Sequence, residues 1–280
     1  MLARIASTLG LWAITVFAVV YFGSLGWTVL IAVLAGGALE ETCRLLERIG
    51  LKPMSKCAQV FSAAIFAASW LFPHFDIFHF GGGSLIFACC AVFTALIAVR
   101  DPYGDFIPKT VVPTVAAILC VPFPLHWLAV AGAEWATETS AYTGVLLAVW
   151  IVAAAKFSDV GAYVIGAAFG RHKMSPNISP NKTWEGAVGG LVSSAAISAA
   201  IAWLGSPILP ETFQPLTAAT TGTAIGAAAI VSDLLESVLK RRADIKDSGA
   251  FIPGIGGALD LADSLLLSVP LGATMLAIIL

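Results

Sequence analysis

Charged side chains are scarce in this 280-residue sequence, at 11% of all residues, whereas hydrophobic side chains make up 59%. Soluble domains average about 45–50% apolar residues and about 25% charged ones, so the composition excludes an ordinary soluble fold. The formal net charge of −2 also lacks the basic excess that would indicate a nucleic-acid partner. We therefore expect an all-α, polytopic integral membrane protein that lies in the lipid bilayer.

Cysteine and histidine are also few, with five and four residues. The cysteines lie in or beside apolar runs, with no paired spacing and no accompanying histidine cluster: Cys43, Cys57, Cys89, Cys90 and Cys120. We interpret them as reduced packing residues, and we expect neither a disulfide framework nor a zinc site.

Long apolar segments separated by short polar breaks predict about nine membrane spans of roughly twenty residues each. The expected spans are 5–22, 25–40, 57–72, 83–99, 110–131, 141–170, 184–204, 215–238 and 264–280. The first run has no clear cleavage site after it, which favours an uncleaved span over a secretion signal. We divide the chain into N-terminal transmembrane helices at 1–140 and a C-terminal catalytic region at 141–280.

Lysine and arginine occur in every second connection between these spans and are absent from the others. The basic connections hold Arg44, Arg48, Lys52 and Lys56; Arg100 and Lys109; Arg171, Lys173 and Lys182; and Lys240, Arg241, Arg242 and Lys246. Cytoplasmic loops of membrane proteins are enriched in basic residues. The pattern therefore predicts a protein of the cytoplasmic (inner) membrane with its N-terminus inside and its C-terminus outside.

The segment 232–264 holds six carboxylates and four of the fifteen basic side chains. Helical periodicity places its first polar residues on one side of a helix: Asp233, Glu236, Ser237, Lys240, Arg241 and Asp244. A Gly/Pro-rich stretch at 251–257 predicts a loop. Asp260 and Asp263 follow, and their spacing places them on one face of the next helix, where they can share a hard cation. Mg²⁺ fits such oxygen ligands. The alternative is a solvated, charge-rich loop that only orients the protein.

A second polar group lies in the inner half of the sixth span. Lys156, Asp159, Tyr163, Gly166 and Gly170 share one helical face. A charged residue in mid-membrane costs about 2.5–3.5 kcal/mol, so we expect these side chains to line a polar cavity facing the cytoplasm. The alternative is a structural ion pair between the lysine and the aspartate.

The connection after this span contains two Ser-Pro pairs, which predict an irregular loop. Thr183 is expected to cap the following helix, with Glu185 in its first turn. Small residues recur every four positions in the seventh and eighth spans and predict close helix packing: Gly186, Gly190, Ser194 and Ser198, then Gly222 and Gly226.

Two stretches, 158–190 and 232–264, resemble the phosphatidate cytidylyltransferase (CDP-diacylglycerol synthase) family. The second contains the family's characteristic pattern: Ser237, Lys240, Arg241, Lys246, Asp247, Pro253, Gly254, Asp260 and Asp263. A Ser-Pro-x-Lys-Thr-Trp-Glu-Gly run at 179–186 adds to it. Two positions depart from the family, which usually has His at Ile255 and Arg at Leu261.

The resemblance implies transfer of CMP from CTP to phosphatidate, assisted by Mg²⁺ and with room for a second cation. By analogy the metal ligands are Asp233 and Asp260, followed by Asp263 and Asp159. Further catalytic or substrate-binding roles fall to Lys240, Arg241, Lys246, Asp247, Lys182, Glu185, Ser237, Lys156 and Tyr163. A homodimer is also a family-level expectation.

Three other functions stay open. A diverged relative acting on another lipid phosphate, or an inactive paralogue, is suggested by Ile255 and Leu261. A transporter would also have charges within its spans, but the sequence has no obvious inverted repeat.

Overall fold

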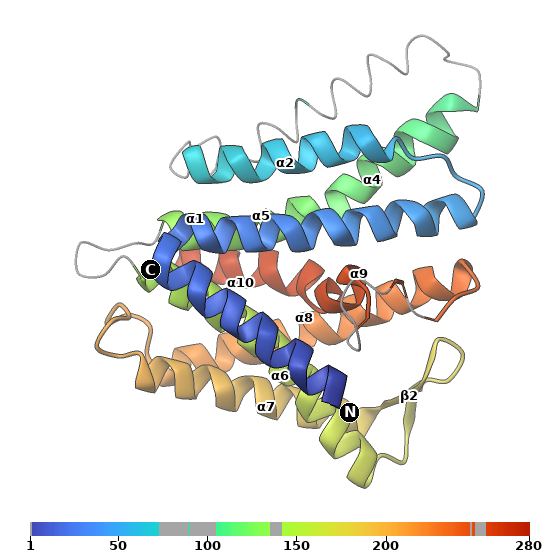
Figure 1. Cartoon of the computed structure of the whole chain (residues 1–280). Helices are drawn as coiled ribbons and strands as arrows, with labels where there is room; N and C mark the ends of the chain where they lie inside the picture. The colour runs from blue at the N-terminus through green and yellow to red at the C-terminus, as the bar shows by residue number, and fades with distance from the viewer. Residues whose placement is uncertain (1, 73–88, 90–104, 135–141, 247, 250–255) are drawn as a thin grey trace. The chain divides into compact units, whose positions relative to one another are not determined.

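The computed structural model describes residues 2–72, 89, 105–134, 142–246, 248–249 and 256–280 (Figure 1). The chain forms two compact units. Unit 1 contains residues 1–134 and 242–262, and unit 2 contains residues 135–241 and 263–280. The division into N-terminal helices at 1–140 and a catalytic region at 141–280 stays a prediction.

Unit 1 is built from helices around α1. Its elements are α1 (Leu2–Arg48), α2 (Ser55–Leu71), the π-helix η1 (Ile107–Val111), α4 (Val112–Cys120), α5 (Pro122–Glu134) and the short α9 (Ala258–Ala262). α1 is interrupted at Gly23, whose φ of 57° suits glycine. The spans expected at 5–22 and 25–40 are therefore the two halves of this element. Trp27 in the second half donates from Nε1 to the Leu128 carbonyl at 2.8 Å, which joins α1 to α5.

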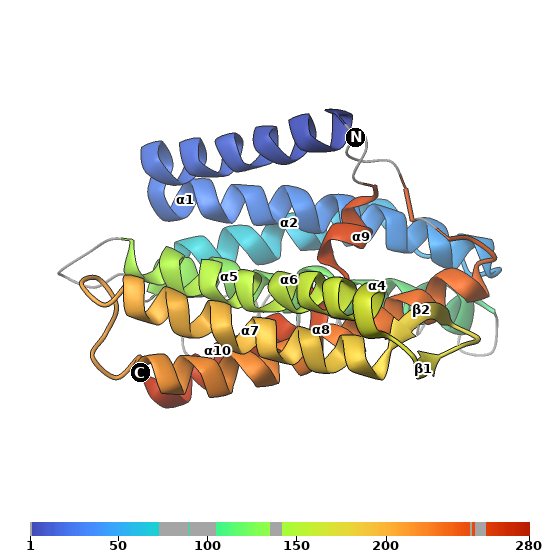
Figure 2. The ribbon, with the colours of Figure 1, turned by 90° about the horizontal axis from the view of Figure 1, so that it is seen from below.

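Unit 2 contains four long helices and one β-hairpin. The helices are α6 (Thr143–Phe169), α7 (Trp184–Leu204), α8 (Pro215–Arg242, whose last residue belongs to unit 1) and α10 (Leu265–Ile279). Strands β1 (Lys173–Ser175) and β2 (Ser179–Thr183) pair antiparallel beyond the end of α6 (Figure 2). The sequence predicted an irregular loop at this position, and that prediction is wrong because the segment forms a β-hairpin. A two-stranded ribbon has only edge strands, which tolerate the missing N–H of Pro180.

Small residues pack α6, α7 and α8 closely, as the sequence predicts. Ser194 donates from Oγ to the Gly222 carbonyl at 2.6 Å, and Ser158 to the Gly226 carbonyl at 3.2 Å. A Cβ added at Gly190 would lie 2.7 Å from the Ser158 carbonyl oxygen, so a larger residue would force the helices apart. The small-residue spacing therefore brings three helices into backbone contact.

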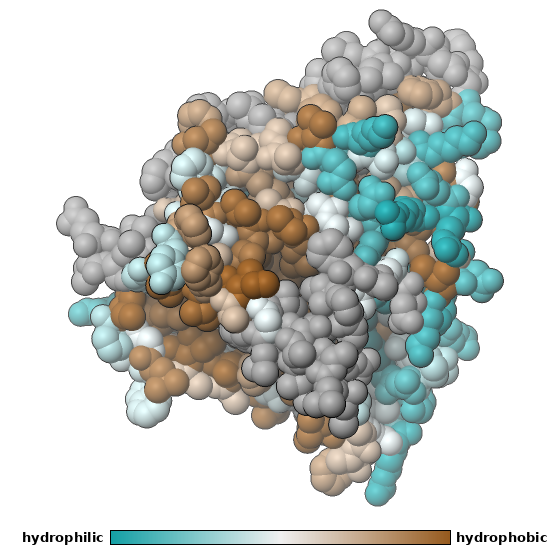
Figure 3. All heavy atoms as spheres, viewed as in Figure 1, coloured by the Kyte–Doolittle hydropathy of each residue, from teal (hydrophilic) through white to brown (hydrophobic). Residues whose placement is uncertain are grey.

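Within the described residues, six helical segments are long and apolar enough to cross a membrane, so the chain is an all-α integral membrane protein apart from its hairpin. The last four expected spans match α6, α7, α8 and α10 closely, and the one at 110–131 corresponds to η1, α4 and α5. The span expected at 57–72 coincides in position with α2, which is not among these six segments. The span expected at 83–99 lies outside the described residues, except for Cys89. Nine spans stay a prediction. Hydrophilic side chains gather where α1 ends and α2 begins (Figure 3).

Candidate functional site

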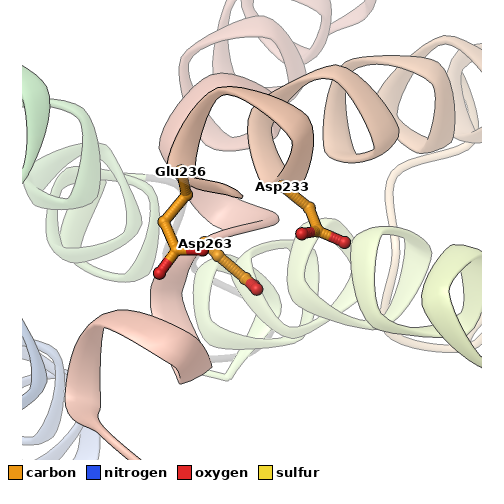
Figure 4. A group of neighbouring side chains, drawn as sticks. All are labelled: Asp233, Glu236 and Asp263. Carbon is orange, nitrogen blue, oxygen red and sulfur yellow. The ribbon is translucent and has the colours of Figure 1, made fainter. Parts of the chain in front are cut away.

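Three carboxylates in unit 2 lie close enough to hold one cation. Asp233 and Glu236 occupy successive turns of α8, and Asp263 approaches them from the segment that precedes α10 (Figure 4). Each offers a carboxylate oxygen, and these oxygens lie within 4.8 Å of one another. We call these three residues the acidic cluster. Glu236 is the most deeply buried of them, with 2% of its side chain exposed.

Backbone contacts explain why Asp263 meets α8. The Ser232 hydroxyl donates to the Asp263 carbonyl, and the Leu267 amide donates to the Ser232 hydroxyl at 3.3 Å. The Asp263 carboxylate also accepts from the Ser264 amide at 2.5 Å. An aspartate that bonds its neighbour's amide competes with helical hydrogen bonding. Accordingly α9 ends at Ala262, and residues 263 and 264 form a turn before α10.

Three lysines lie against the carboxylates of unit 2. Lys182 Nζ is 2.8 Å from Asp233 Oδ2, and Lys240 Nζ is 2.6 Å from Glu236 Oε2. Lys156 lies 3.4 Å from Asp263 Oδ1. Each member of the acidic cluster therefore has its own lysine, and the three lysines lie on three different elements, β2, α8 and α6.

Lys156 also joins Asp159 to this group. Its ammonium is 3.8 Å from Asp159 Oδ2, and it donates to the Ser264 hydroxyl at 2.7 Å. The ion pair within α6, which the sequence left as the alternative to a polar cavity, is thus present, but it extends to residues before α10. When all seven side chains are ionised, four carboxylates face three lysines and one negative charge is left over.

The hairpin is fixed at its base and near its tip. Thr183 caps α7 by accepting from the Gly186 amide at 3.1 Å, as predicted. Glu185 accepts from the Arg171 amide at 3.1 Å and lies 2.5 Å from His172 Nδ1. Arg241 Nε donates to the Ile178 carbonyl at 3.2 Å, between the strands. These contacts set the position of Lys182 on β2, so Glu185 and Arg241 hold the hairpin in the geometry described here.

Asp260 lies in unit 1, in the first turn of α9, and we call residues 256–260, which lead into that helix, the Asp260 turn. Its Oδ2 accepts from the Gly257 amide at 2.9 Å. The expectation that Asp260 and Asp263 share one helical face is wrong, because α9 ends between them. A cation shared by these two carboxylates stays a prediction.

The remaining predicted residues have varied surroundings. Ser237 donates to Asp233 Oδ1 at 3.4 Å, beside the acidic cluster. Tyr163 is 77% exposed on α6, and Lys246 is also exposed. Asp247 and Ile255 lie outside the described residues. A cytoplasm-facing cavity stays a prediction.

Sequence reasoning placed Glu236 on the polar face of its helix but gave it no ligand role. Its spacing of three from Asp233 was the available signal, because residues three apart lie on neighbouring turns of a helix. Glu41 was also missed, and its carboxylate lies against the Asp260 turn in unit 1. No local pattern marks Glu41, which is more than 200 residues away along the chain.

The donor set of the acidic cluster fits a hard divalent cation. Carboxylate oxygens are preferred by Mg²⁺, which takes few protein ligands and keeps positions for water and substrate phosphate. Three carboxylates within 4.8 Å also repel one another, and the lysines offset this repulsion only in part. A bound cation would release those lysines to contact anions.

Comparison with known proteins adds an independent finding. Residues 2–279 match the family described as "Cytidylyltransferase family". A phosphatidate cytidylyltransferase of Synechocystis is 31% identical over 268 residues, which cover 91% of this chain and 89% of the relative. A Pseudomonas aeruginosa protein of the same name is 39% identical over 144 residues, 51% of this chain and 49% of the relative. The Haemophilus influenzae one is 36% identical over 129 residues, 46% of this chain and 45% of the relative.

Proposed function

The chain belongs to the cytidylyltransferase family, and from this premise we propose that it transfers CMP from CTP to phosphatidate with the help of a divalent cation. The named activity of its relatives supports the reaction. The observation that carries the site is the acidic cluster with a lysine against each of its carboxylates.

The reaction needs no protein nucleophile. A phosphate oxygen of phosphatidate attacks the α-phosphorus of CTP, and the bond from that phosphorus to the bridging oxygen of the β-phosphate breaks. Pyrophosphate leaves with the electrons of that bond, and CDP-diacylglycerol stays in the bilayer. The barrier lies in bringing several anions together and in stabilising the charge that develops, so positioning and cations supply the catalysis.

Asp233, Glu236 and Asp263 would hold Mg²⁺, with Asp159 as a further ligand and room for a second cation. Asp260 in unit 1 is proposed separately as a ligand of a divalent cation. The ion would neutralise phosphate charge at the reacting centre. Lys156, Lys182 and Lys240 would supply ammonium groups for phosphate oxygens, and charge-assisted hydrogen bonds of this type are the strong ones. Ser237 orients Asp233, with which it shares a hydrogen bond of 3.4 Å.

Other predicted side chains serve the same anions. Arg241 and Lys246 bind triphosphate or lipid phosphate, and Asp247 orients the basic groups. Lys156 and Tyr163 are further substrate-binding residues, and Glu185 holds the hairpin behind Lys182.

The membrane placement follows from charge. Four basic residues lie at the end of α1, in the short connection and at the start of α2: Arg44, Arg48, Lys52 and Lys56. Their number supports a cytoplasmic position for this region and for the N-terminus in the inner membrane. Nine spans, a cavity open to the cytoplasm and a homodimer complete the proposal. The site would then face the compartment that supplies CTP.

A second candidate is cytidylylation of a different lipid phosphate. Leu261 stands in α9, one residue from Asp260, where the family usually has arginine. Loss of that guanidinium removes a phosphate contact close to a predicted ligand and favours a changed lipid substrate.

Purified protein incubated with α-labelled CTP and a panel of lipid phosphates separates these functions. We expect labelled CDP-diacylglycerol from phosphatidate and release of one pyrophosphate per product. Preference for a lipid phosphate without glycerol would instead establish the second candidate. Uptake of a solute by proteoliposomes with no turnover of CTP would sink both and revive a transporter.

A further inference from the structure

Glu41 is a buried carboxylate in the second half of α1, with only 5% of the residue exposed. The reaction described above gives it no role. It accepts from the Ser248 hydroxyl at 2.9 Å, from the Ala258 amide at 3.1 Å and from the Leu259 amide at 2.8 Å. All three donors come from the segment 242–262 of the same compact unit. A carboxylate from the start of the chain therefore binds the backbone next to Asp260.

Two glycines show that this segment fits closely around the Glu41 carboxylate. A Cβ added at Gly249 would lie 2.3 Å from Glu41 Oε1, and one at Gly257 would lie 2.4 Å from Glu41 Oε2. Neither position has room for a side chain while Glu41 stays in place. Gly256 has a φ of 132°, a conformation that favours glycine. The glycines thus allow the backbone to approach the Glu41 carboxylate, and a larger residue at Gly249 or Gly257 would collide with it.

The same turn fixes Asp260. The Gly257 amide donates to Asp260 Oδ2 at 2.9 Å, while the next two amides along the chain donate to Glu41. Three successive N–H groups are therefore shared between two carboxylates, one from α1 and one from the turn itself. A shift of the turn away from Glu41 would move Asp260 with it.

We propose that Glu41 is a positioning residue for CMP transfer, which fixes Ser248 and the Asp260 turn so that the Asp260 carboxylate is held ready for a substrate-bound divalent cation. The claim that Glu41 aids CMP transfer rests on the proposed function. The claim that Glu41 fixes the Asp260 turn does not depend on it. Ion-paired or amide-bonded carboxylates form strong hydrogen bonds, so replacing the charge weakens all three contacts at once.

Glu41→Gln is the sharpest variant, because it keeps the shape and removes the charge. In this variant an NH₂ group replaces one of the two accepting oxygens, so it would face an N–H or O–H donor to which it cannot bond. Glu40→Gln is the matched control, since Glu40 is the neighbouring residue and its exposed carboxylate pairs with Arg44 at 3.3 Å. Ser248→Ala removes one donor and leaves Glu41 unchanged.

The first readout is hydrogen–deuterium exchange of the purified full chain in detergent, without metal or substrate. We expect protection of the amides in 256–262 to fall roughly 10-fold in Glu41→Gln and less in Ser248→Ala, with no change in Glu40→Gln. Unchanged protection in both Glu41→Gln and Ser248→Ala would overturn the proposal. If Glu41→Gln does not fold, the Ser248→Ala result decides.

The second readout is the Mg²⁺ dependence of CMP transfer. We expect kcat to fall roughly 10-fold in Glu41→Gln and the Mg²⁺ concentration for half-maximal rate to rise, whereas KM for phosphatidate stays within twofold. A variant with loosened amides and an unaltered Mg²⁺ dependence would contradict the positioning role. Wild-type protein that transfers no CMP would refute the proposed function, and the exchange measurement would still test the contact between Glu41 and the turn.

Discussion

Lys182 on β2 lies 2.8 Å from Asp233 on α8, so the hairpin places a lysine ammonium group against one carboxylate of the acidic cluster. Both side chains are partly buried, with 22% and 26% exposed. The pair therefore joins the hairpin, which the sequence predicted to be an irregular loop, to α8, which the sequence predicted correctly as a helix. A phosphate group entering between these two elements would meet the lysine at the point where the carboxylate now holds it.

Replacing Lys182 by methionine should weaken nucleotide use specifically. Loss of one charge-assisted hydrogen bond to phosphate lowers kcat/KM for CTP by roughly 10- to 100-fold. The control is Lys173→Met, because Lys173 is an exposed lysine on the opposite strand. Steady-state kinetics with varied CTP measure both variants. Equal losses in the two would show that only the general charge of the hairpin matters.

Glu236 and Lys240 form a buried pair whose members depend on each other. Glu236→Leu alone removes the carboxylate that lies 2.6 Å from the Lys240 ammonium and should destabilise the fold by about 3–5 kcal/mol. Glu236→Leu combined with Lys240→Leu should recover most of this loss, because paired apolar residues replace the paired charges. Thermal unfolding in detergent measures the difference. A double variant no more stable than the single one would show that the pair does not act as a unit.

Gly190 should tolerate no larger side chain. Gly190→Val would place Cβ 2.7 Å from the Ser158 carbonyl oxygen, and overpacking of this type destabilises a fold by about 1–3 kcal/mol. Gly10→Ala is the control, because no atom of the described residues lies within 4 Å of a Cβ at that position. Unfolding midpoints of the two variants in the same detergent check this. Equal midpoints would mean that α6 and α7 can separate without cost.

The helices could be predicted because their signals are local. Apolar runs determine membrane spans, and the four-residue spacing from Gly186 to Ser198 places small residues on one face. Thr183 also acts through neighbouring residues, since the amide it caps is only three positions away. Each of these predictions depends on a stretch shorter than one helix.

The finer geometry depends on contacts between distant residues. The Ser232 hydroxyl donates to the Asp263 carbonyl across 31 positions, and this contact, together with the turn at residues 263–264, separates Asp263 from α9, which contains Asp260. Glu236 becomes part of the acidic cluster only because Asp263 is brought to α8 in this way. Sequence spacing gives the periodicity of a helix but not where a tertiary hydrogen bond ends it. For the same reason Glu41 could be found only in the structure.

The most direct test of the account is the Mg²⁺ titration of CMP transfer by wild-type protein and by Asp233→Asn, with CTP and phosphatidate saturating and all metal first removed by chelation. We expect no product from wild-type protein without metal, full recovery on adding Mg²⁺, and a rate at least about 100-fold lower for Asp233→Asn at every Mg²⁺ concentration. Transfer that proceeds without any divalent cation, or an Asp233→Asn variant that matches the wild type, would contradict the claim that the acidic cluster holds the ion that assists the reaction.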